Sequence, residues 1–524
     1  MRRIAMVDAL TGNVADLVTE AARRVPQHAA LLDEGGGAAL SWQRVDAAVT
    51  AFAGRLLEAG LVPGDRVAVV LPNGSRCAVA LFGVLRAGGV AVPVGISSPA
   101  PELARVLDDS GAALLVGTAP DGLGDLLAEA SGGLPTVLPP PELDPAPSGV
   151  ELTADEPRGG EDLAVLCYTS GTAGLPRGVM LSHRALLSNV AQCAALRPAP
   201  VNSTDRVLLA VPLFHAYGLG PGLLQVASAG ATAVLMETFG VDRALAACAE
   251  NRVTAVVGVP AMYQAFAAVG ADRLAEALSS VRLLTSGAAP LPPSVLATIR
   301  AATGLSVFEG YGLTETGPVL TSTLVAGVAK PGSVGRPLPG VEITLVDSDG
   351  RPVGAGADPD EEGWFDDVAD PRSETGRVAA RGPNLFSGYW PDGAHGPDAE
   401  GWFRTGDVGY FDADGDLRLV DRATDLIIVN GFNVYPNEVE RVLGELAEVA
   451  EAAAVGVPDE RTGELVKAVI VLRPGAVLTE DTVREHCAER LARFKVPRAV
   501  EFVDSLPHGV TGKVRRASLR GSVA

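Results

Sequence analysis

The amino-acid sequence predicts an α/β protein, with a large N-terminal domain of stacked α/β subdomains and a small C-terminal α+β domain. Its 524 residues exceed the size of one ordinary domain, and 47% of them are apolar, which is enough for large cores. Short apolar runs alternate with helix-period segments over most of the chain, as in parallel sheets covered by helices. The pattern changes near residue 421. We therefore expect an N-terminal domain at residues 1–421 and a C-terminal domain at residues 422–524, which the family resemblance described below implies to be mobile.

The expected strands of the large domain are short apolar runs, several of them bounded by Pro or Gly. A helix-period segment at residues 45–59 is one of those that separate them. The uncharged stretch at residues 254–271 is near membrane-spanning length, but Gly258 and Pro260 favour a buried strand followed by a helix. The strand candidates are residues 66–71, 90–94, 112–116 and 163–168.

The small domain has its own strand and helix pattern. Residues 484–520 carry nine Lys or Arg against four Asp or Glu, and this local excess fits phosphate binding as well as it fits a solvated surface. An acidic stretch at residues 358–370 is expected to be a solvated loop, with a partner-docking loop as the alternative. Expected strands are residues 426–429, 452–457 and 466–472, and expected helices are residues 436–446 and 480–490.

Charge and cysteine usage exclude several classes of protein. The formal net charge of −21 argues against a nucleic-acid partner and against binding to anionic lipid. Five cysteines without C-x-x-C spacing indicate neither a disulfide framework nor a zinc site, which suits a cytoplasmic protein. The basic start of the chain lacks an apolar segment after it, so we expect no signal peptide and no integral membrane segment.

A loop rich in glycine and hydroxyl groups provides the first chemical signal. Residues 168–180 read YTSGTAGLPRGVM, after an expected strand and before a helix-like segment that starts at Ser182. Glycines let backbone N–H groups converge on one point, and such a nest suits phosphate oxygens. The loop is not a Walker A motif. Its candidate phosphate-binding residues are Thr169, Ser170, Gly171, Thr172, Gly174 and Arg177.

This loop resembles the phosphate-loop signature of the adenylate-forming superfamily, which includes acyl-CoA synthetases, peptide-synthetase adenylation domains and firefly luciferase. Two positions depart from the usual pattern, because Ala173 replaces a frequent Thr and Arg177 replaces the usual Lys. Arginine keeps the positive charge but presents a planar fork instead of a point ammonium. We expect nucleotide binding with altered loop kinetics.

Further motifs follow in the order of that superfamily. Residues 212–219 (PLFHAYGL) resemble the acyl- and aryl-CoA ligase version, in which His215 is an active-site gate. Residues 285–291 (TSGAAPL) and 310–318 (GYGLTETGP) resemble the adenine and metal segments. The resemblance implies Mg²⁺ binding by Glu315 with Thr169 as a second ligand, since carboxylate oxygen suits this ion. It also implies nucleotide contacts for Gly287, Ala288, Ala289, Glu309, Gly310, Tyr311, Gly312 and Thr314.

The last motifs lie at and beyond the expected domain boundary. By the same resemblance, Asp407 in GWFRTGD binds the ribose hydroxyls, and Arg422 opens a hinge segment in which Thr424 replaces the usual Lys or Asp. Lys513, which follows Thr-Gly near the end of the chain, aligns with the adenylation lysine. Residues 431–440 (GFNVYPNEVE) resemble the loop that faces coenzyme A, with Gly431, Phe432 and Tyr435 as its candidate contacts.

Together these motifs imply an ATP-dependent acyl-CoA ligase that uses ATP, Mg²⁺ and coenzyme A. The match to the fatty-acyl branch favours a medium- or long-chain fatty acid over an aryl acid. Within enzymes, the alternative is an acyl-AMP ligase that loads a carrier protein; outside them, it is a catalytically inactive adenylate-binding protein. Intact Glu315, Asp407, Arg422 and Lys513 argue against the inactive protein.

Replacing the adenylation lysine should separate the two half-reactions. Lys513→Ala is expected to abolish acid-dependent ATP–pyrophosphate exchange, because a charge that neutralises the attacking anion and the phosphates is lost. Thioester formation from supplied acyl-AMP should be spared. An equal loss of both steps would contradict the role assigned to Lys513.

Overall fold

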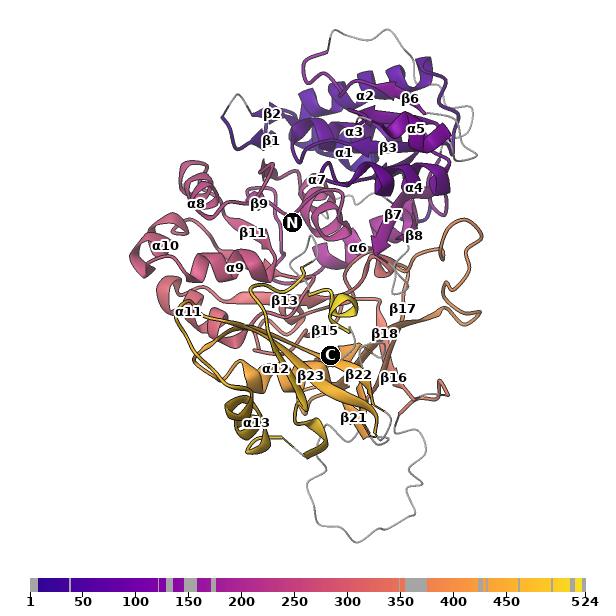
Figure 1. The fold of residues 1–524 in the computed structure, drawn as a ribbon. Coiled ribbons are helices and arrows are strands. Elements are labelled where there is room, and N and C mark those ends of the chain that lie inside the picture. The colour runs from indigo at the N-terminus through magenta and orange to yellow at the C-terminus, as the bar shows by residue number, and fades with distance from the viewer. Residues whose placement is uncertain are drawn as a thin grey trace, which may run out of the picture. The chain divides into compact units, whose positions relative to one another are not determined.

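The chain folds into two compact units, which are described separately here (Figure 1). The first unit comprises Met1–Glu342 and Ala380–Phe403, and the second comprises Ile343–Ala379 and Arg404–Ala524. The predicted boundary at residues 421 and 422 lies inside the second unit and stays a prediction about which part moves. The structure is a computed structural model that describes residues 8–36, 39–120, 122–128, 135–145, 158–170, 176–347, 349–353, 375–422, 427–429, 432–459, 462–491, 493–508 and 514–520.

A six-stranded sheet of order β6-β5-β3-β4-β7-β8 belongs to the first unit. All of its neighbouring strands are parallel except β7 and β8. Buried side chains of α4 (Ala100–Ser110) and α5 (Leu123–Ala128) pack against its central strands, which are apolar on both faces, as is typical of covered parallel sheets. The strands are β3 (Arg66–Val70), β4 (Val90–Pro93), β5 (Leu114–Gly117), β6 (Thr136–Leu138), β7 (Leu163–Ser170) and β8 (Pro176–Ser182).

The segment predicted as one phosphate loop is largely a β-hairpin. Strands β7 and β8 pair antiparallel, with Thr169 opposite Arg177 and Tyr168 opposite Gly178. The expectation that residues 168–180 form a loop was therefore wrong for most of them, because this Gly-containing stretch completes an edge of the sheet. Gly171, Thr172, Ala173 and Gly174 lie outside the described residues.

A nine-stranded sheet of order β15-β14-β13-β12-β11-β9-β10-β1-β2 also belongs to the first unit. Its middle strands, from β13 to β1, are parallel, whereas its edge pairs are antiparallel. The strands are β1 (Ala29–Asp33), β2 (Leu40–Ser41), β9 (Arg206–Leu209), β10 (Thr232–Leu235), β11 (Ala255–Gly258), β12 (Leu283–Ser286), β13 (Val307–Tyr311), β14 (Thr321–Ser322) and β15 (Arg336–Pro337).

Helices cover these two sheets. Buried side chains of α8, α9, α10 and α11 form one apolar cluster with the central strands of the nine-stranded sheet. The α-helices are α1 (Asp16–Arg24), α2 (Trp42–Glu58), α3 (Ser75–Arg86), α4 (Ala100–Ser110), α5 (Leu123–Ala128), α6 (His183–Ala194), α7 (Gln225–Ala229), α8 (Val241–Glu250), α9 (Pro260–Ala267), α10 (Ala271–Ala277) and α11 (Pro293–Thr303), with a π-helical segment η1 (Gly218–Leu224) and the 3-10 turns η2 (Thr314–Thr316) and η3 (Thr323–Val325).

The second unit combines sheets and short helices. Most residues of a four-stranded sheet of order β16-β17-β18-β19 belong to it, and so does a smaller sheet in which β24 joins β21-β20-β23-β22. The elements are β16 (Glu342–Val346), β17 (Gly376–Arg381), β18 (Trp402–Phe411), β19 (Leu417–Arg422), β20 (Ile427–Val429), β21 (Phe432–Val434), α12 (Pro436–Leu443), β22 (Val449–Asp459), β23 (Gly463–Leu472), α13 (Glu480–Ala488), η5 (Arg493–Lys495), β24 (Ala499–Phe502) and η6 (Arg516–Leu519).

The predicted α/β class is confirmed, and each strand and helix predicted by residue range in the sequence has a counterpart among the elements above. Residues 254–271 contain β11 and α9, as expected, and no helix in the described parts of the chain is long and apolar enough to cross a membrane. The acidic stretch at residues 358–370 lies outside the described residues.

A buried histidine joins the start of α6 to the N-terminal segment. Ser182 caps the helix by accepting a hydrogen bond from the Ala185 N–H at 3.2 Å, and His183 Nδ1 accepts one from the Val14 N–H at 3.0 Å. Only 1% of His183 is exposed, and burial lowers its pKa from 6.5 to about 4, with Asp162 opposing that shift. A protonated ring could not accept the hydrogen bond from Val14.

Acidification should destabilise the first unit through His183. Between pH 6.5 and 4 the unfolded chain binds a proton that the folded chain excludes, so stability falls with falling pH by about 3 kcal/mol. His183→Asn, which keeps an acceptor but cannot titrate, should remove this part of the slope in urea unfolding measured from pH 4 to 7. The matched control is His28→Asn, at an exposed side chain, which should leave the slope unchanged. An identical slope in His183→Asn and the parent would refute the assignment.

Candidate active site

Two predicted nucleotide segments follow neighbouring parallel strands. β11 pairs with β12, and β12 pairs with β13, in continuous parallel register. Parallel strands end at the same edge of a sheet, and that edge is where open α/β sheets bind ligands. The structure therefore brings together residues 286–291 after β12 and residues 311–316 after β13.

The backbone after β12 is closely packed and locally strained. Gly287 lies against Tyr217, since a Cβ placed on this glycine would be 2.8 Å from the tyrosine ring. Ala288 has a φ of +70°, a left-handed conformation that costs energy for a residue with a side chain. Such strain persists only where surrounding structure enforces it, and it clusters at functional sites.

Glu309 fixes this loop to the next strand. Its side chain, 7% exposed, accepts a hydrogen bond from the Leu291 N–H at 3.2 Å. Burial raises the pKa of Glu309 to about 7, and the hydrogen bond from Leu291 opposes that rise. Glu309, which lies in β13 and was predicted as a nucleotide contact, therefore has a backbone partner in the predicted adenine segment after β12.

Glu315 is held in the turn η2 by a residue that the sequence did not reveal. The Tyr389 hydroxyl donates to Glu315 Oε1 at 2.7 Å, and the Phe386 N–H donates to the Glu315 carbonyl at 2.9 Å. The Arg177 guanidinium lies 5.5 Å from the Tyr389 ring centroid, a cation–π distance. Strand β8 and the predicted magnesium ligand are therefore connected through one tyrosine.

No local sequence signal pointed to Tyr389. It lies 74 residues from Glu315, in the aromatic segment Gly388-Tyr389-Trp390, and only the fold brings the two together. Tyr311, also predicted at this site, is 9% exposed, and its carbonyl accepts the Leu320 N–H at 2.8 Å.

His215 occupies a tight turn before η1. Its Nδ1 accepts a hydrogen bond from the Tyr217 N–H at 3.1 Å, and burial lowers its pKa, so the ring is neutral at pH 7. A Cβ on Gly218 would be 2.2 Å from the Pro212 carbonyl oxygen, so only glycine allows this turn. His215 is thereby oriented by its own loop.

The other predicted residues lie on the second unit. Asp407, 7% exposed, is opposite Arg422 in the pairing of β18 with β19, and its N–H donates to Thr405 Oγ1 at 3.2 Å. Tyr435 precedes α12 and its carbonyl accepts the Glu438 N–H at 3.0 Å. Thr424, Gly431 and Lys513 lie outside the described residues, as do the side chains of Ser170, Arg422 and Phe432.

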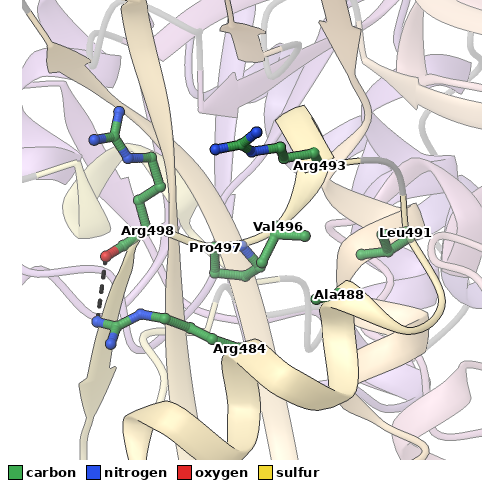
Figure 2. Close-up of a pocket in the computed structure, with 7 residues that line it drawn as sticks. All are labelled: Arg484, Ala488, Leu491, Arg493, Val496, Pro497 and Arg498. Atoms are coloured by element: carbon green, nitrogen blue, oxygen red, sulfur yellow. Dashed lines mark hydrogen bonds between the residues drawn. The ribbon is translucent and has the colours of Figure 1, made fainter.

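An open pocket on the second unit is lined by three arginines (Figure 2). Arg484 comes from α13, Arg493 from η5 and Arg498 from the residue before β24. Arg484 is paired with Glu480 and Asp481, and it donates to the Arg498 carbonyl at 3.3 Å. Arg493 and Arg498 have no ion pair within the described ranges. Two unpaired guanidinium groups make this pocket suited to phosphate.

A small cavity of about 60 Å³ lies within the first unit against β11, β12 and β13. The strand ends that carry the nucleotide segments form one wall, through Ser286 and Gly310, while Tyr217, Pro221 and Gln225 contribute another. The lining is mostly apolar, and its strand-end wall adjoins the predicted nucleotide segments.

Comparisons with known proteins agree with this fold. The model of the AMP-binding enzyme family matches residues 18–390, and that of the AMP-binding enzyme C-terminal domain matches residues 438–513. A feruloyl-CoA synthase of Amycolatopsis sp is 39% identical, over 95% of this chain and 96% of that one. A long-chain-fatty-acid–CoA ligase of Yersinia pestis is 33% identical, over 92% and 90%. ATP-bound MatB from Rhodopseudomonas palustris superposes with a TM-score of 0.85 at 32% identity, covering 97% and 98%.

The fold and these relatives define an adenylate-forming ligase. The chain belongs to the AMP-binding enzyme family. Its relatives are ATP-dependent, AMP-forming ligases of acyl or aryl acids with coenzyme A, for which Mg²⁺ is the standard ion. The resemblance seen in the sequence is confirmed, and so are ATP, coenzyme A and Mg²⁺.

Removing the tyrosine hydroxyl should loosen Glu315 and raise the Mg²⁺ requirement. Tyr389→Phe is expected to lower kcat of adenylation by about 10-fold and to raise the Mg²⁺ concentration at half-maximal rate, because a hydrogen bond to a charged group is lost. Glu315→Gln should cost about 10²–10³ in kcat.

The matched control is Tyr410→Phe in β18, because the Tyr410 hydroxyl has no hydrogen-bond partner in the described part of the chain. This variant should leave unchanged both the kcat of adenylation and the Mg²⁺ concentration at half-maximal rate. Parallel magnesium titrations of all four proteins provide the measurement. Parental titration curves for Tyr389→Phe and Glu315→Gln would contradict the assignment.

Proposed function

We propose that the chain converts a largely apolar carboxylic acid, ATP and coenzyme A into an acyl-CoA thioester, AMP and pyrophosphate. The observation that carries the proposal is the position of Glu315. This carboxylate is held by Tyr389 in η2, which follows β13, and Phe308 and Gly310 of β13 line the apolar cavity. A metal ligand and an acid-binding cavity thus share one edge of one sheet.

In the first step, an oxygen of the acid attacks the α-phosphorus of ATP, and pyrophosphate leaves. The obstacle is electrostatic, because an anion approaches a polyanion in a protein of net charge −21. Arg177, Lys513 and the N–H groups of the phosphate loop supply the compensating positive charge. Thr314 and Asp407 bind the α-phosphate and the ribose.

The residues at Glu315 fit a magnesium ion. Glu315 is 9% exposed, its Oε1 is held by Tyr389, and its Oε2 has no hydrogen-bond partner in the residues described. A fixed carboxylate with a free oxygen is a suitable ligand for a hard divalent cation, and Thr169 adds a hydroxyl oxygen. Bound there, Mg²⁺ would supply positive charge beside the phosphates.

In the second step, the thiol sulfur of coenzyme A bonds to the acyl carbon, and AMP leaves. We propose that residues from Arg422 onward rotate between the steps, withdrawing Lys513 and presenting Gly431, Phe432 and Tyr435. Arg493 and Arg498, in the pocket of Figure 2, then face the coenzyme A phosphates. His215, neutral and held by its own loop, gates the path between the nucleotide and acyl sites.

The apolar cavity supports an acid with an apolar body. A medium- or long-chain fatty acid, the class predicted from the sequence, meets this condition, and so does an aryl acid. The relatives are named for both kinds of acid. The five cysteines are all buried and unpaired, which supports work in the reducing cytoplasm.

The direct test supplies ATP, Mg²⁺ and a panel of fatty and aryl acids, with and without coenzyme A, and measures AMP and thioester by mass spectrometry. We expect equal amounts of AMP and acyl-CoA for at least one acid. Acyl-AMP without thioester would favour loading of a carrier protein. Absence of acid-dependent ATP–pyrophosphate exchange would favour an inactive adenylate-binding protein.

The same assay tests the arginine pocket. Arg493→Ala should raise KM for coenzyme A about 10-fold and leave ATP–pyrophosphate exchange unchanged, because the lost charge contacts only the thiol substrate. The control is Arg473→Ala. This variant removes an exposed arginine of the same unit, whose side chain donates to the Ala447 carbonyl. Unchanged KM in Arg493→Ala would remove this pocket from the proposal.

A further inference from the structure

Two polar side chains that line the apolar cavity of the first unit each have a buried atom without a hydrogen-bond partner. Gln225, at the start of α7, is 2% exposed and its Oε1 is unpaired, and Ser286, at the end of β12, is 2% exposed with an unpaired Oγ. Among the described side chains, five buried nitrogen or oxygen atoms lack a partner. Two of those five line this one cavity, so the unpaired atoms are not scattered through the core.

Folding alone does not explain these atoms. A buried polar group without a partner is destabilising, and native proteins pair nearly all of them. Glutamine is also a poor choice for an apolar wall, where leucine or methionine would pack equally well. An unpaired amide at a ligand cavity indicates that the ligand supplies the missing partner.

The two side chains come from different elements of the cavity wall. Ser286 directly precedes Gly287 of the predicted adenine segment, so it lies at the end of the cavity where the carboxylate must react. Gln225 lies ten residues beyond His215 on α7, a helix that carries none of the nucleotide segments. Gln225 therefore faces the body or tail of the acid.

We propose that the substrate is an apolar carboxylic acid that carries a hydroxyl group remote from its carboxylate, and that this hydroxyl hydrogen-bonds to the Gln225 side-chain amide. The inference rests on the proposed function and narrows its substrate class. A hydroxyl both donates and accepts, so it satisfies the amide in either orientation of its planar end. An unsubstituted alkyl or aryl tail would leave the amide buried and unpaired.

Two kinds of acid carry this chemistry: hydroxylated aryl acids and long alkyl acids with a terminal hydroxyl. The wild-type protein should be assayed with matched pairs that differ only in the hydroxyl: 4-hydroxycinnamate with cinnamate, and 12-hydroxydodecanoate with dodecanoate. In at least one pair we expect kcat/KM to be about 10- to 100-fold higher for the hydroxylated acid, because only it pairs the amide. The pair that shows the preference identifies the kind of acid.

The variant Gln225→Met keeps the length of the side chain and removes the amide. It should reduce the hydroxyl preference to near unity while KM for ATP stays unchanged. Gln192→Met in α6 is the matched control, because Gln192 is also buried but its amide is paired with Asn189 and Asn384. The control should keep the parental preference.

Failure of the inference and failure of the proposed function give different results. Acids that form acyl-CoA with no hydroxyl preference in either pair would overturn the inference and leave the ligase proposal standing. The same holds if Gln225→Met keeps the parental preference. No AMP or acyl-CoA from any acid would overturn the proposed function itself.

Discussion

The parallel pairing of β11, β12 and β13 is the constraint on which the rest of the candidate site depends. It puts the ends of three strands side by side, so that the segments after β12 and β13 become neighbours. Residues of the same strands line one side of the apolar cavity. Under the proposed function, an acid in that cavity would have its reactive end at the nucleotide segments.

Two buried glutamates at this edge are held for different purposes. Glu309 accepts a hydrogen bond from the Leu291 N–H and fixes the loop after β12, and burial raises its pKa to about 7. Glu315 accepts a hydrogen bond from the Tyr389 hydroxyl and keeps its other oxygen available. The difference lies in the partner: a backbone donor connects Glu309 to the loop after β12, whereas the Tyr389 side chain orients Glu315, the residue proposed to bind Mg²⁺.

In the apolar cavity, affinity for the acid and orientation of the acid would come from different groups of the lining. Under the proposed function, the apolar walls would supply most of the affinity for an acid, since burial of apolar surface is non-directional. The orientation of the acid must come from a few polar groups. Gln225 Oε1 and Ser286 Oγ are the buried atoms without a hydrogen-bond partner in the described lining of the cavity. A hydroxyl on the acid would then determine how far the acid enters and thus how its carboxylate meets ATP.

The sequence alone determined the α/β class, the order of the strands and helices, and the family, because periodicity and contiguous motifs are local properties. It also identified Glu315, Asp407 and Lys513 as candidates, since each lies in a recognisable motif. Only the tertiary structure decided that Arg177 belongs to a strand, that Tyr389 holds Glu315, and that Gln225 lines the cavity. These contacts join residues distant in the chain, and pairing and burial in the fold bring them together.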